Sequence, residues 1–249
     1  MIVESILSEL ETYANPVRKE HNAYFFKTGK GEYAEGDQFV GVSVPDVRKV
    51  VANHLEASLA DIEELLQSPL HEVRLTGLFI LVDQMEQTEN RSWSKTHTLK
   101  ETEAIRRKIY EFYLSHTAAV NNWDLVDGSA PYIVGSYLID KDRKPLYHLA
   151  HSKNLWEQRI AIVSTYAFIR KGDTADTYAI ATLLLHHPHD LIHKAVGWML
   201  REAGKRDLAG LTFFLDQHAA EMPRTMLRYS LEKLSTEKRK HYMEMKQQS

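Results

Sequence analysis

Three of the chain's four tryptophans lie in short motifs that place an aromatic ring beside charged side chains. The motifs are Asn121-Asn122-Trp123-Asp124-Leu125-Val126-Asp127, Asn154-Leu155-Trp156-Glu157-Gln158-Arg159 and His193-Lys194-Ala195-Val196-Gly197-Trp198. Asp127, Arg159 and Lys194 follow one another at 32 (127 to 159) and 35 (159 to 194) residues, the length of one antiparallel helix pair in a helical-repeat protein. The spacing predicts that these groups share the concave face, which is the usual binding surface of such repeats.

The residue types suit a site that holds a flat group and stabilises positive charge. Trp123 and Asp127 are four residues apart and therefore share one face of a helix. An indole ring attracts a cation through its π-face, a carboxylate stabilises a developing cation and orients water, and the arginine fork binds two phosphate oxygens. Structural roles are the alternative, because tryptophans often pack between helices and Asp127 could cap a helix or pair with Arg159. We interpret Trp156 as such a packing residue.

Composition excludes several classes of protein. The chain has 249 residues, 43% of them hydrophobic, and no cysteine, so disulfides, thiolate catalysis and cysteine-ligated metals are excluded. A formal net charge of -3 argues against unspecific coating of nucleic acid, although a local basic groove remains compatible with it. The N-terminus lacks the pattern of a signal peptide and no segment has the apolar length of a membrane span. The absence of cysteine fits a reducing cytoplasm, so we expect a cytoplasmic protein.

Apolar residues recur at intervals of three and four, which predicts an all-α fold. We expect one domain over residues 1–249, with a first helix over 2–13, a glycine-rich loop over 28–43, and a helix start at Val44-Pro45-Asp46. A second helix of a repeat begins within 68–78, where Arg74 has the same helical phase as Arg159. Residues 84–103 are polar and predict a long connection between repeats, and 235–249 form a charged terminal helix.

Together the three motifs resemble the signatures of the AlkD-type DNA alkylation repair family, whose members are HEAT-like-repeat glycosylases that remove bulky or cationic alkylated purines. The resemblance extends from about residue 15 to residue 204. It implies a right-handed α-α superhelix with a concave DNA-binding groove. It further implies that Trp123 and Trp198 flank the damaged nucleotide, that Asp127 is the catalytic carboxylate, and that Arg159 grips the DNA backbone. Among the other basic residues, we expect Lys194 and Arg201 to bind the backbone as well.

The expected activity is hydrolysis of the N-glycosidic bond of N3- and N7-alkylpurines, without cofactor or metal, by a monomer acting on double-stranded DNA. His186, His187, His189 and His193 suggest a metal site, but no Glu-x-x-His arrangement accompanies them, and a helix cap or phosphate contact explains them better. Nucleotide-binding, serine-hydrolase and zinc-protease motifs are absent. Two alternatives remain open: a non-catalytic repeat protein that binds damaged or branched DNA, and a scaffold that binds a protein.

Overall fold

A computed structural model describes residues 1–245 of the protein. Many of its helices begin at short polar residues whose side chains cap the first turn. Ser43 caps the helix that contains Pro45 by accepting a hydrogen bond from the Asp46 amide at 3.3 Å. Thr98 and Glu101 form a capping box, in which each side chain accepts from the other's backbone amide. Such caps satisfy amides that a helix leaves without partners.

The described residues contain helices and no β-strand, which confirms the all-α prediction; Gln38 and Leu70 form an isolated bridge. None of these helices is long and apolar enough to cross a membrane. The contacts divide the chain into two compact units, Met1–Ile133 and Val134–Ser249. The single repeat domain over residues 1–249 stays a prediction.

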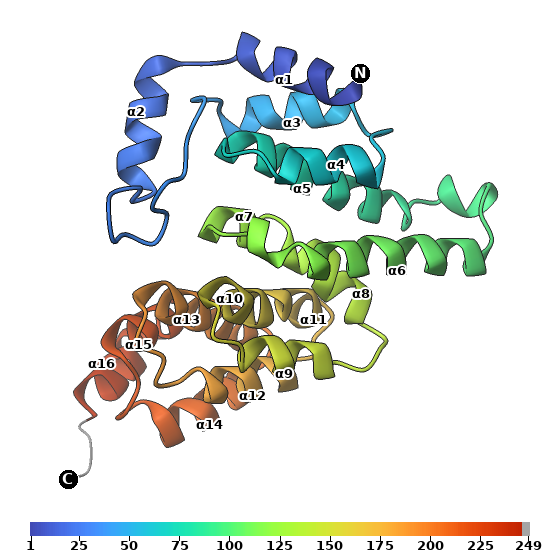
Figure 1. Cartoon of the computed structure of the whole chain (residues 1–249). Coiled ribbons are helices and arrows are strands. Elements are labelled where there is room, and N and C mark those ends of the chain that lie inside the picture. The colour runs from blue at the N-terminus through green and yellow to red at the C-terminus, as the bar shows by residue number, and fades with distance from the viewer. Residues whose placement is uncertain (246–249) are drawn as a thin grey trace. The chain divides into compact units, whose positions relative to one another are not determined.

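The first unit is built around α5, and Figure 1 shows its helices from blue to green. The bounds are α1 Ile2–Thr12, α2 Pro16–Phe25, α3 Val44–Asn53, α4 Leu59–Leu66, α5 His71–Gln87, α6 Leu99–Ser115 and α7 Trp123–Asp127, with 3-10 turns at Trp93–Lys95 and Thr117–Ala119. Thirteen of the seventeen α5 residues are buried, because α3 and α4 pack against it. The predicted loop over 28–43 is confirmed, but the helix α2 before it was not predicted.

The second unit is centred on α13, against which α10, α12, α14 and α15 pack. Its bounds are α8 Ser136–Leu138, α9 Lys144–Ala150, α10 Leu155–Ser164, α11 Tyr166–Arg170, α12 Ala175–Leu183, α13 Asp190–Gly204, α14 Leu208–His218, α15 Arg224–Ser230 and α16 Thr236–Glu244; a π-helical turn, Pro131–Gly135, spans the boundary of the units. Gly197 lets α13 approach α15, since a Cβ atom there would lie 2.5 Å from the Met226 carbonyl oxygen. The predicted terminal helix is confirmed over 236–244, and 246–249 lie outside the described residues.

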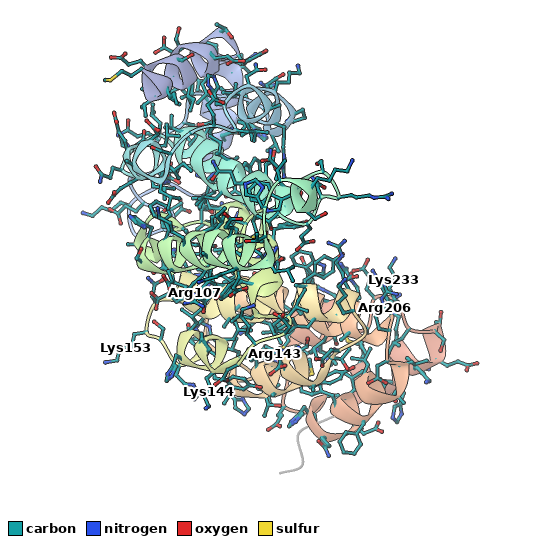
Figure 2. The ribbon with its side chains drawn as sticks, turned by 90° about the vertical axis from the view of Figure 1, so that its right-hand side faces the viewer. Arg107, Arg143, Lys144, Lys153, Arg206 and Lys233 are labelled. Atoms are coloured by element: carbon teal, nitrogen blue, oxygen red, sulfur yellow. The ribbon has the colours of Figure 1, made fainter. Side chains whose placement is uncertain are left out.

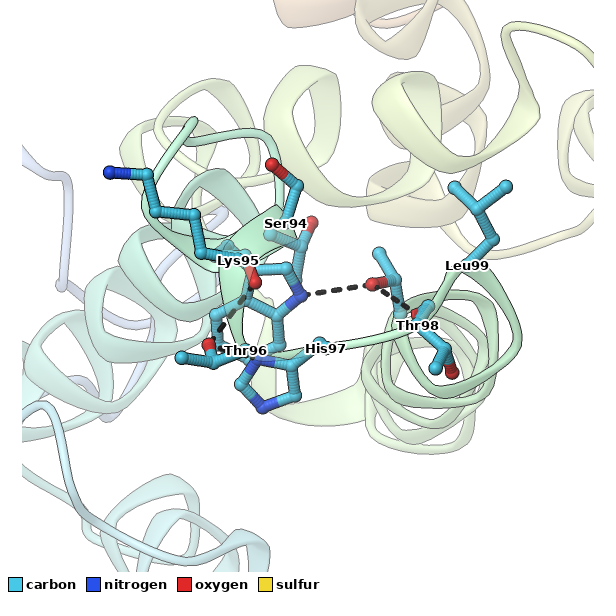
Figure 3. A pocket seen from close by; sticks show the side chains of 9 residues that line it. Ser94, Lys95, Thr96, His97, Thr98 and Leu99 are labelled. Atoms are coloured by element: carbon cyan, nitrogen blue, oxygen red, sulfur yellow. Dashed lines mark hydrogen bonds between the residues drawn. The ribbon is translucent and has the colours of Figure 1, made fainter.

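The prediction of a connection over 84–103 is wrong in its limits. α5 continues to Gln87 and α6 begins at Leu99, so only 88–98 connect them. Residues 94–99 of this short segment are labelled in Figure 3. Trp93 orders the segment: its ring stacks on His97 at 3.7 Å between centroids, and its Nε1 donates to Thr102 Oγ1 at 3.0 Å. The polar residues at the two ends of the predicted connection belong to the last turn of α5 and the first turn of α6. The exposed faces of these helices carry polar side chains.

Candidate functional site

Trp123 and Asp127 begin and end the same five-residue helix, α7. The buried Asn122 caps this helix, because its Oδ1 accepts from the Trp123 amide at 2.8 Å. Both the indole and the Asp127 carboxylate are half-buried. The structure therefore brings the predicted aromatic ring and the predicted carboxylate together on one helical turn.

One face of Trp123 packs against the protein. The Phe26 ring stacks on it with centroids 5.3 Å apart, and the Phe25 ring meets it edge-on at 6.0 Å. Phe26 in turn contacts the rings of Phe39 and His71 at 5.1 and 5.0 Å. This aromatic cluster fixes the plane of the indole, and no motif in the sequence predicts its members.

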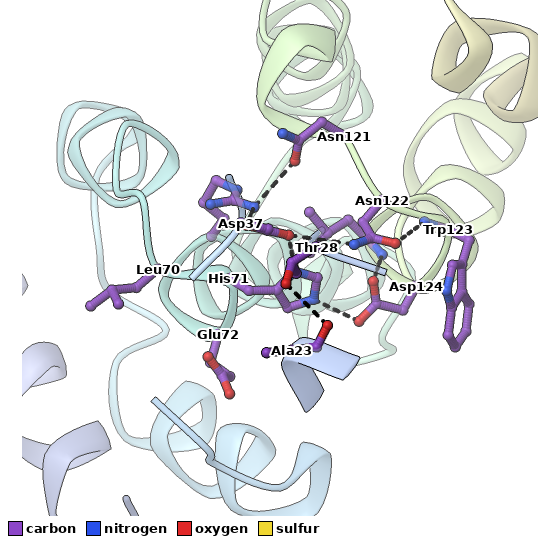
Figure 4. Close-up of polar contacts among 12 residues, drawn as sticks. Ala23, Thr28, Asp37, Leu70, His71, Glu72, Asn121, Asn122, Trp123 and Asp124 are labelled. Atoms are coloured by element: carbon purple, nitrogen blue, oxygen red, sulfur yellow. Dashed lines mark hydrogen bonds and ion pairs between the residues drawn. The ribbon is translucent and has the colours of Figure 1, made fainter. Parts of the chain in front are cut away.

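A buried ion-pair network lies next to the first turn of α7, where Figure 4 labels Asp37, His71 and Asp124. The His71 ring joins two carboxylates, with Nδ1 2.9 Å from Asp37 Oδ2 and Nε2 2.8 Å from Asp124 Oδ2. Arg74 Nη2 donates to the other Asp37 oxygen at 2.5 Å and to Asn121 Oδ1 at 3.2 Å. The side chains of His71 and Asp37 are only 2% and 4% exposed. The network ties α5 and the glycine-rich loop to the first turn of α7.

The network sets the charge of its members. Burial alone would lower the pKa of His71, but hydrogen bonds and attraction from Asp124 and Asp37 outweigh it and raise the pKa to about 9. Burial raises the pKa of Asp37, yet the hydrogen bond from His71 and the charge of Arg74 hold it below its ordinary value. At neutral pH, two cations and two carboxylates therefore compensate one another beneath α7.

We expect the stability of the protein to depend on the proton of His71. Its pKa is higher in the folded than in the unfolded chain, so its contribution is complete below pH 6.5 and is lost as pH rises through about 9. Urea unfolding of the wild type should therefore show a steeper loss of stability between pH 6.5 and 9 than unfolding of His71→Gln. Parallel pH curves for the two proteins would show that His71 does not carry this proton.

The glycine-rich loop is held in place by a buried carboxylate. Glu72 accepts hydrogen bonds from the amides of Val40, Gly41 and Val42 at 2.9, 2.9 and 3.3 Å. Gly41 has φ +91, and a Cβ atom there would lie 2.1 Å from the Asn15 carbonyl oxygen, so only glycine fits. Asp37 and Phe39 lie in the same loop, just before Gly41. The loop therefore supplies an ion-pair partner and an aromatic ring to His71.

Asp127 lies near a buried phenol. Tyr113 is 1% exposed, and its hydroxyl lies 2.9 Å from Ser129 Oγ. Burial raises the pKa of Tyr113 far above its ordinary range, the Ser129 hydrogen bond lowers it, and the charge of Asp127 raises it further. Tyr113 therefore stays neutral. The Trp123 indole and the half-buried Asp127 carboxylate lie one helical turn apart. Such a pair can hold a flat ring against the indole and stabilise a positive charge next to it.

The predicted cations lie in the second unit. Arg159, on α10, is 5% exposed, and its Nη1 donates to the Leu191 carbonyl oxygen of α13 at 2.5 Å. Lys194 pairs with Asp190 at 2.8 Å and keeps a 41% exposed side chain. Arg201 contacts Glu202 at 3.3 Å and also Glu232. The three cations thus differ in access to solvent, and Arg159 is the most enclosed.

The tryptophans of the second unit also differ. Trp156 is 8% exposed, as expected of a packing residue, and its amide is capped by Asn154 Oδ1 at 2.8 Å. Trp198 is half-buried, with its ring 6.1 Å from that of Tyr166. Of these two, Trp198 is therefore the one with indole surface left for a ligand.

Other basic side chains of the second unit are labelled in Figure 2. Arg143 is engaged internally, because its Nη1 contacts Asp173 at 2.6 Å and Asp176 at 2.5 Å. Lys153, Arg206 and Lys233 are exposed. This unit therefore adds exposed positive charge beyond the three cations that the motifs single out.

The histidines near α13 order its first turn. His189 caps the helix by accepting from the Leu191 amide at 3.1 Å, as the cap interpretation predicts, and His187 Nδ1 accepts from the His189 amide at 3.0 Å. Burial, together with neighbouring positive charges, lowers the pKa of both rings. Within residues 1–245 no three histidine, aspartate or glutamate side chains are placed to hold a metal ion.

The fold and the site define an all-α protein of packed helix pairs that carries a carboxylate and an indole on one short helix. A family model described as "DNA alkylation repair enzyme" matches residues 6–234, and the chain belongs to this family. The structure is also similar to a solved one described as "Predicted DNA alkylation repair enzyme from Enterococcus faecalis". The two share 16% sequence identity with a TM-score of 0.63, over 90% of this chain and 97% of the other. A comparison with curated protein sequences gives no significant match.

Proposed function

We propose that the protein is a DNA glycosylase that hydrolyses the N-glycosidic bond of N3- and N7-alkylated purines in double-stranded DNA. The observation that carries the proposal is the position of the Asp127 carboxylate one helical turn from the Trp123 indole, in a chain of the DNA alkylation repair family. Neither side chain is fully buried, which supports contact of both with a ligand.

The chemistry of the substrate explains why one carboxylate is sufficient. An N3- or N7-alkylated purine carries a positive charge, and the electrons of the C1′–N9 bond neutralise it when the bond breaks. The departing base therefore needs no general acid. The sugar becomes cationic at C1′, where the negative charge of Asp127 stabilises it. Water then adds to C1′ and gives up a proton, for which Asp127 is the acceptor.

The remaining residues bind the DNA in this proposal. Trp123 and Trp198 contact the damaged nucleotide through their indole faces, an interaction with a cationic base of about 0.5–2 kcal/mol each. Arg159, Lys194 and Arg201 bind phosphates, and each phosphate contact releases counterions from the DNA. The exposed ammonium group of Lys194 needs the least rearrangement for this role.

Arg159→Ala should weaken DNA affinity and lower the slope of log affinity against log salt by about one unit, because one phosphate contact is lost. Lysine at this position should restore the affinity only in part, since it lacks the planar two-pronged donor. The measurement is fluorescence anisotropy over a salt titration, with Lys194→Ala as the comparison. An unchanged slope together with a lower melting temperature would assign Arg159 a structural role, such as its contact with Leu191, instead of a role in DNA binding.

The products left in the DNA test the proposed reaction. A monofunctional hydrolase leaves an abasic site in an intact strand, so methylated duplex treated with the protein should break only after hot alkali. Excess EDTA should not change the rate. Strand breaks without alkali would contradict a monofunctional reaction, and tight binding without abasic sites would favour the alternative of a non-catalytic DNA-binding protein.

A further inference from the structure

Helix α2 turns its apolar side chains toward solvent. Val17 and Tyr24 are each 78% exposed and Phe25 is 52% exposed, and none of the ten α2 residues is buried. The spacing of 17, 21, 24 and 25 places these residues and His21 on one face of the helix. A surface helix normally turns such a stripe toward the protein core. We call Val17, His21, Tyr24 and Phe25 the α2 face.

The α2 face is continuous with the candidate site in the same unit. The Phe25 ring meets Trp123 edge-on at 6.0 Å, and the His21 ring stacks on Phe25 at 6.0 Å with 13° between planes. A row of three rings therefore runs outward from the tryptophan that we propose to contact the lesion. A ligand held at Trp123 would have its next flat group within reach of Phe25.

Charge indicates what kind of ligand suits this face. Residues 16–30 contain four cationic side chains and one acidic side chain, Glu20, in a chain whose net charge is -3. The cations are Arg18, Lys19, Lys27 and Lys30. Lys27 Nζ lies 5.0 Å from the centre of the Tyr24 ring. Aromatic rings combined with lysines characterise surfaces that stack nucleic-acid bases and neutralise their phosphates.

We propose that the α2 face is a stacking surface for an unstacked DNA base next to the lesion. The proposal rests on the proposed function only in taking DNA as the partner. In an intact duplex the faces of the bases are covered by their neighbours, whereas an unpaired base is exposed at little cost. The protein therefore prefers DNA that contains an unpaired nucleotide, even without alkylation.

The test compares two unalkylated duplexes that differ by one bulged adenine. Anisotropy titrations should show tighter binding of the wild type to the bulged duplex. Tyr24→Ala should weaken that binding by about fivefold or more while leaving binding of the intact duplex unaffected. Phe25→Ala, whose ring also contacts Trp123, should weaken binding of the bulged duplex at least as much. Phe213→Ala is the matched control, because this α14 ring is also exposed, at 65%, and lies in the other unit. It should change neither affinity.

Three results would overturn the inference: equal affinity of the wild type for both duplexes, an unchanged preference in both variants, or a wild-type dimer that Tyr24→Ala dissociates in sedimentation. The last would make the α2 face a contact between two copies of the chain. Excision of alkylpurines is measured separately. Preference for the bulged duplex without release of alkylpurines would support stacking at the α2 face and contradict the proposed glycosylase activity. Release of alkylpurines without that preference would support the glycosylase activity and contradict stacking at the α2 face.

Discussion

Replacing Asp127 with asparagine is expected to slow base excision by about 100-fold or more, while DNA affinity stays within about twofold. The amide keeps the size of the side chain and part of its hydrogen bonding. It offers no full negative charge to the cationic sugar, and it cannot take a proton from water. The measurement is the single-turnover rate on methylated duplex with protein in excess, combined with anisotropy for affinity.

Asp124→Asn is the matched control for this experiment. Asp124 lies on the same short helix, but its carboxylate is 2.8 Å from His71 Nε2. Its replacement should therefore lower stability and leave the excision rate per folded molecule nearly unchanged. A slower rate for Asp124→Asn than for Asp127→Asn would reverse the assignment of the catalytic carboxylate.

The largest effect on stability is expected for Asp37→Ala. This carboxylate is 4% exposed and contacts both His71 and Arg74, so its removal leaves two buried cations short of negative charge. Loss of one partner from a buried ion pair costs about 3–5 kcal/mol. We expect a decrease of this size in the free energy of unfolding, measured with urea at pH 7.

Asp83→Ala provides the comparison for Asp37→Ala. Asp83 pairs with Arg48 at 3.4 Å and is 29% exposed, so its loss should cost about 1 kcal/mol or less. Similar unfolding free energies for the two variants would mean that the network beneath α7 is not a main source of stability.

The sequence predicted those features that depend on local patterns. The periodic apolar residues indicated helices throughout, and Pro45 with Asp46 in the first turn marked the start of α3. The four-residue spacing of Trp123 and Asp127 placed both on one turn, which is α7. Each of these inferences needs only the geometry of a single helix.

Contacts between distant residues could not be predicted in this way. Asp37 and His71 are 34 residues apart, and no local pattern pairs a loop carboxylate with that ring. The helical phase of a residue also does not determine how deeply its side chain is buried. The repeat pattern predicts the same helical phase for Arg74 and Arg159 but says nothing of their burial. Each is 5% exposed and donates to a backbone carbonyl oxygen, that of Ser68 and that of Leu191 respectively. Helical phase shows which side a residue occupies, whereas packing by other elements decides whether it is covered.

The proposed glycosylase activity is tested most directly by identifying what the wild-type protein releases from methylated double-stranded DNA. Chromatography of the soluble fraction should show free 3-methyladenine and 7-methylguanine that increase with time, with no release of unmodified purines. The protein Asp127→Asn, in equal amount, should release little of either base. Absence of free methylpurines with the folded, DNA-binding wild type would contradict the account.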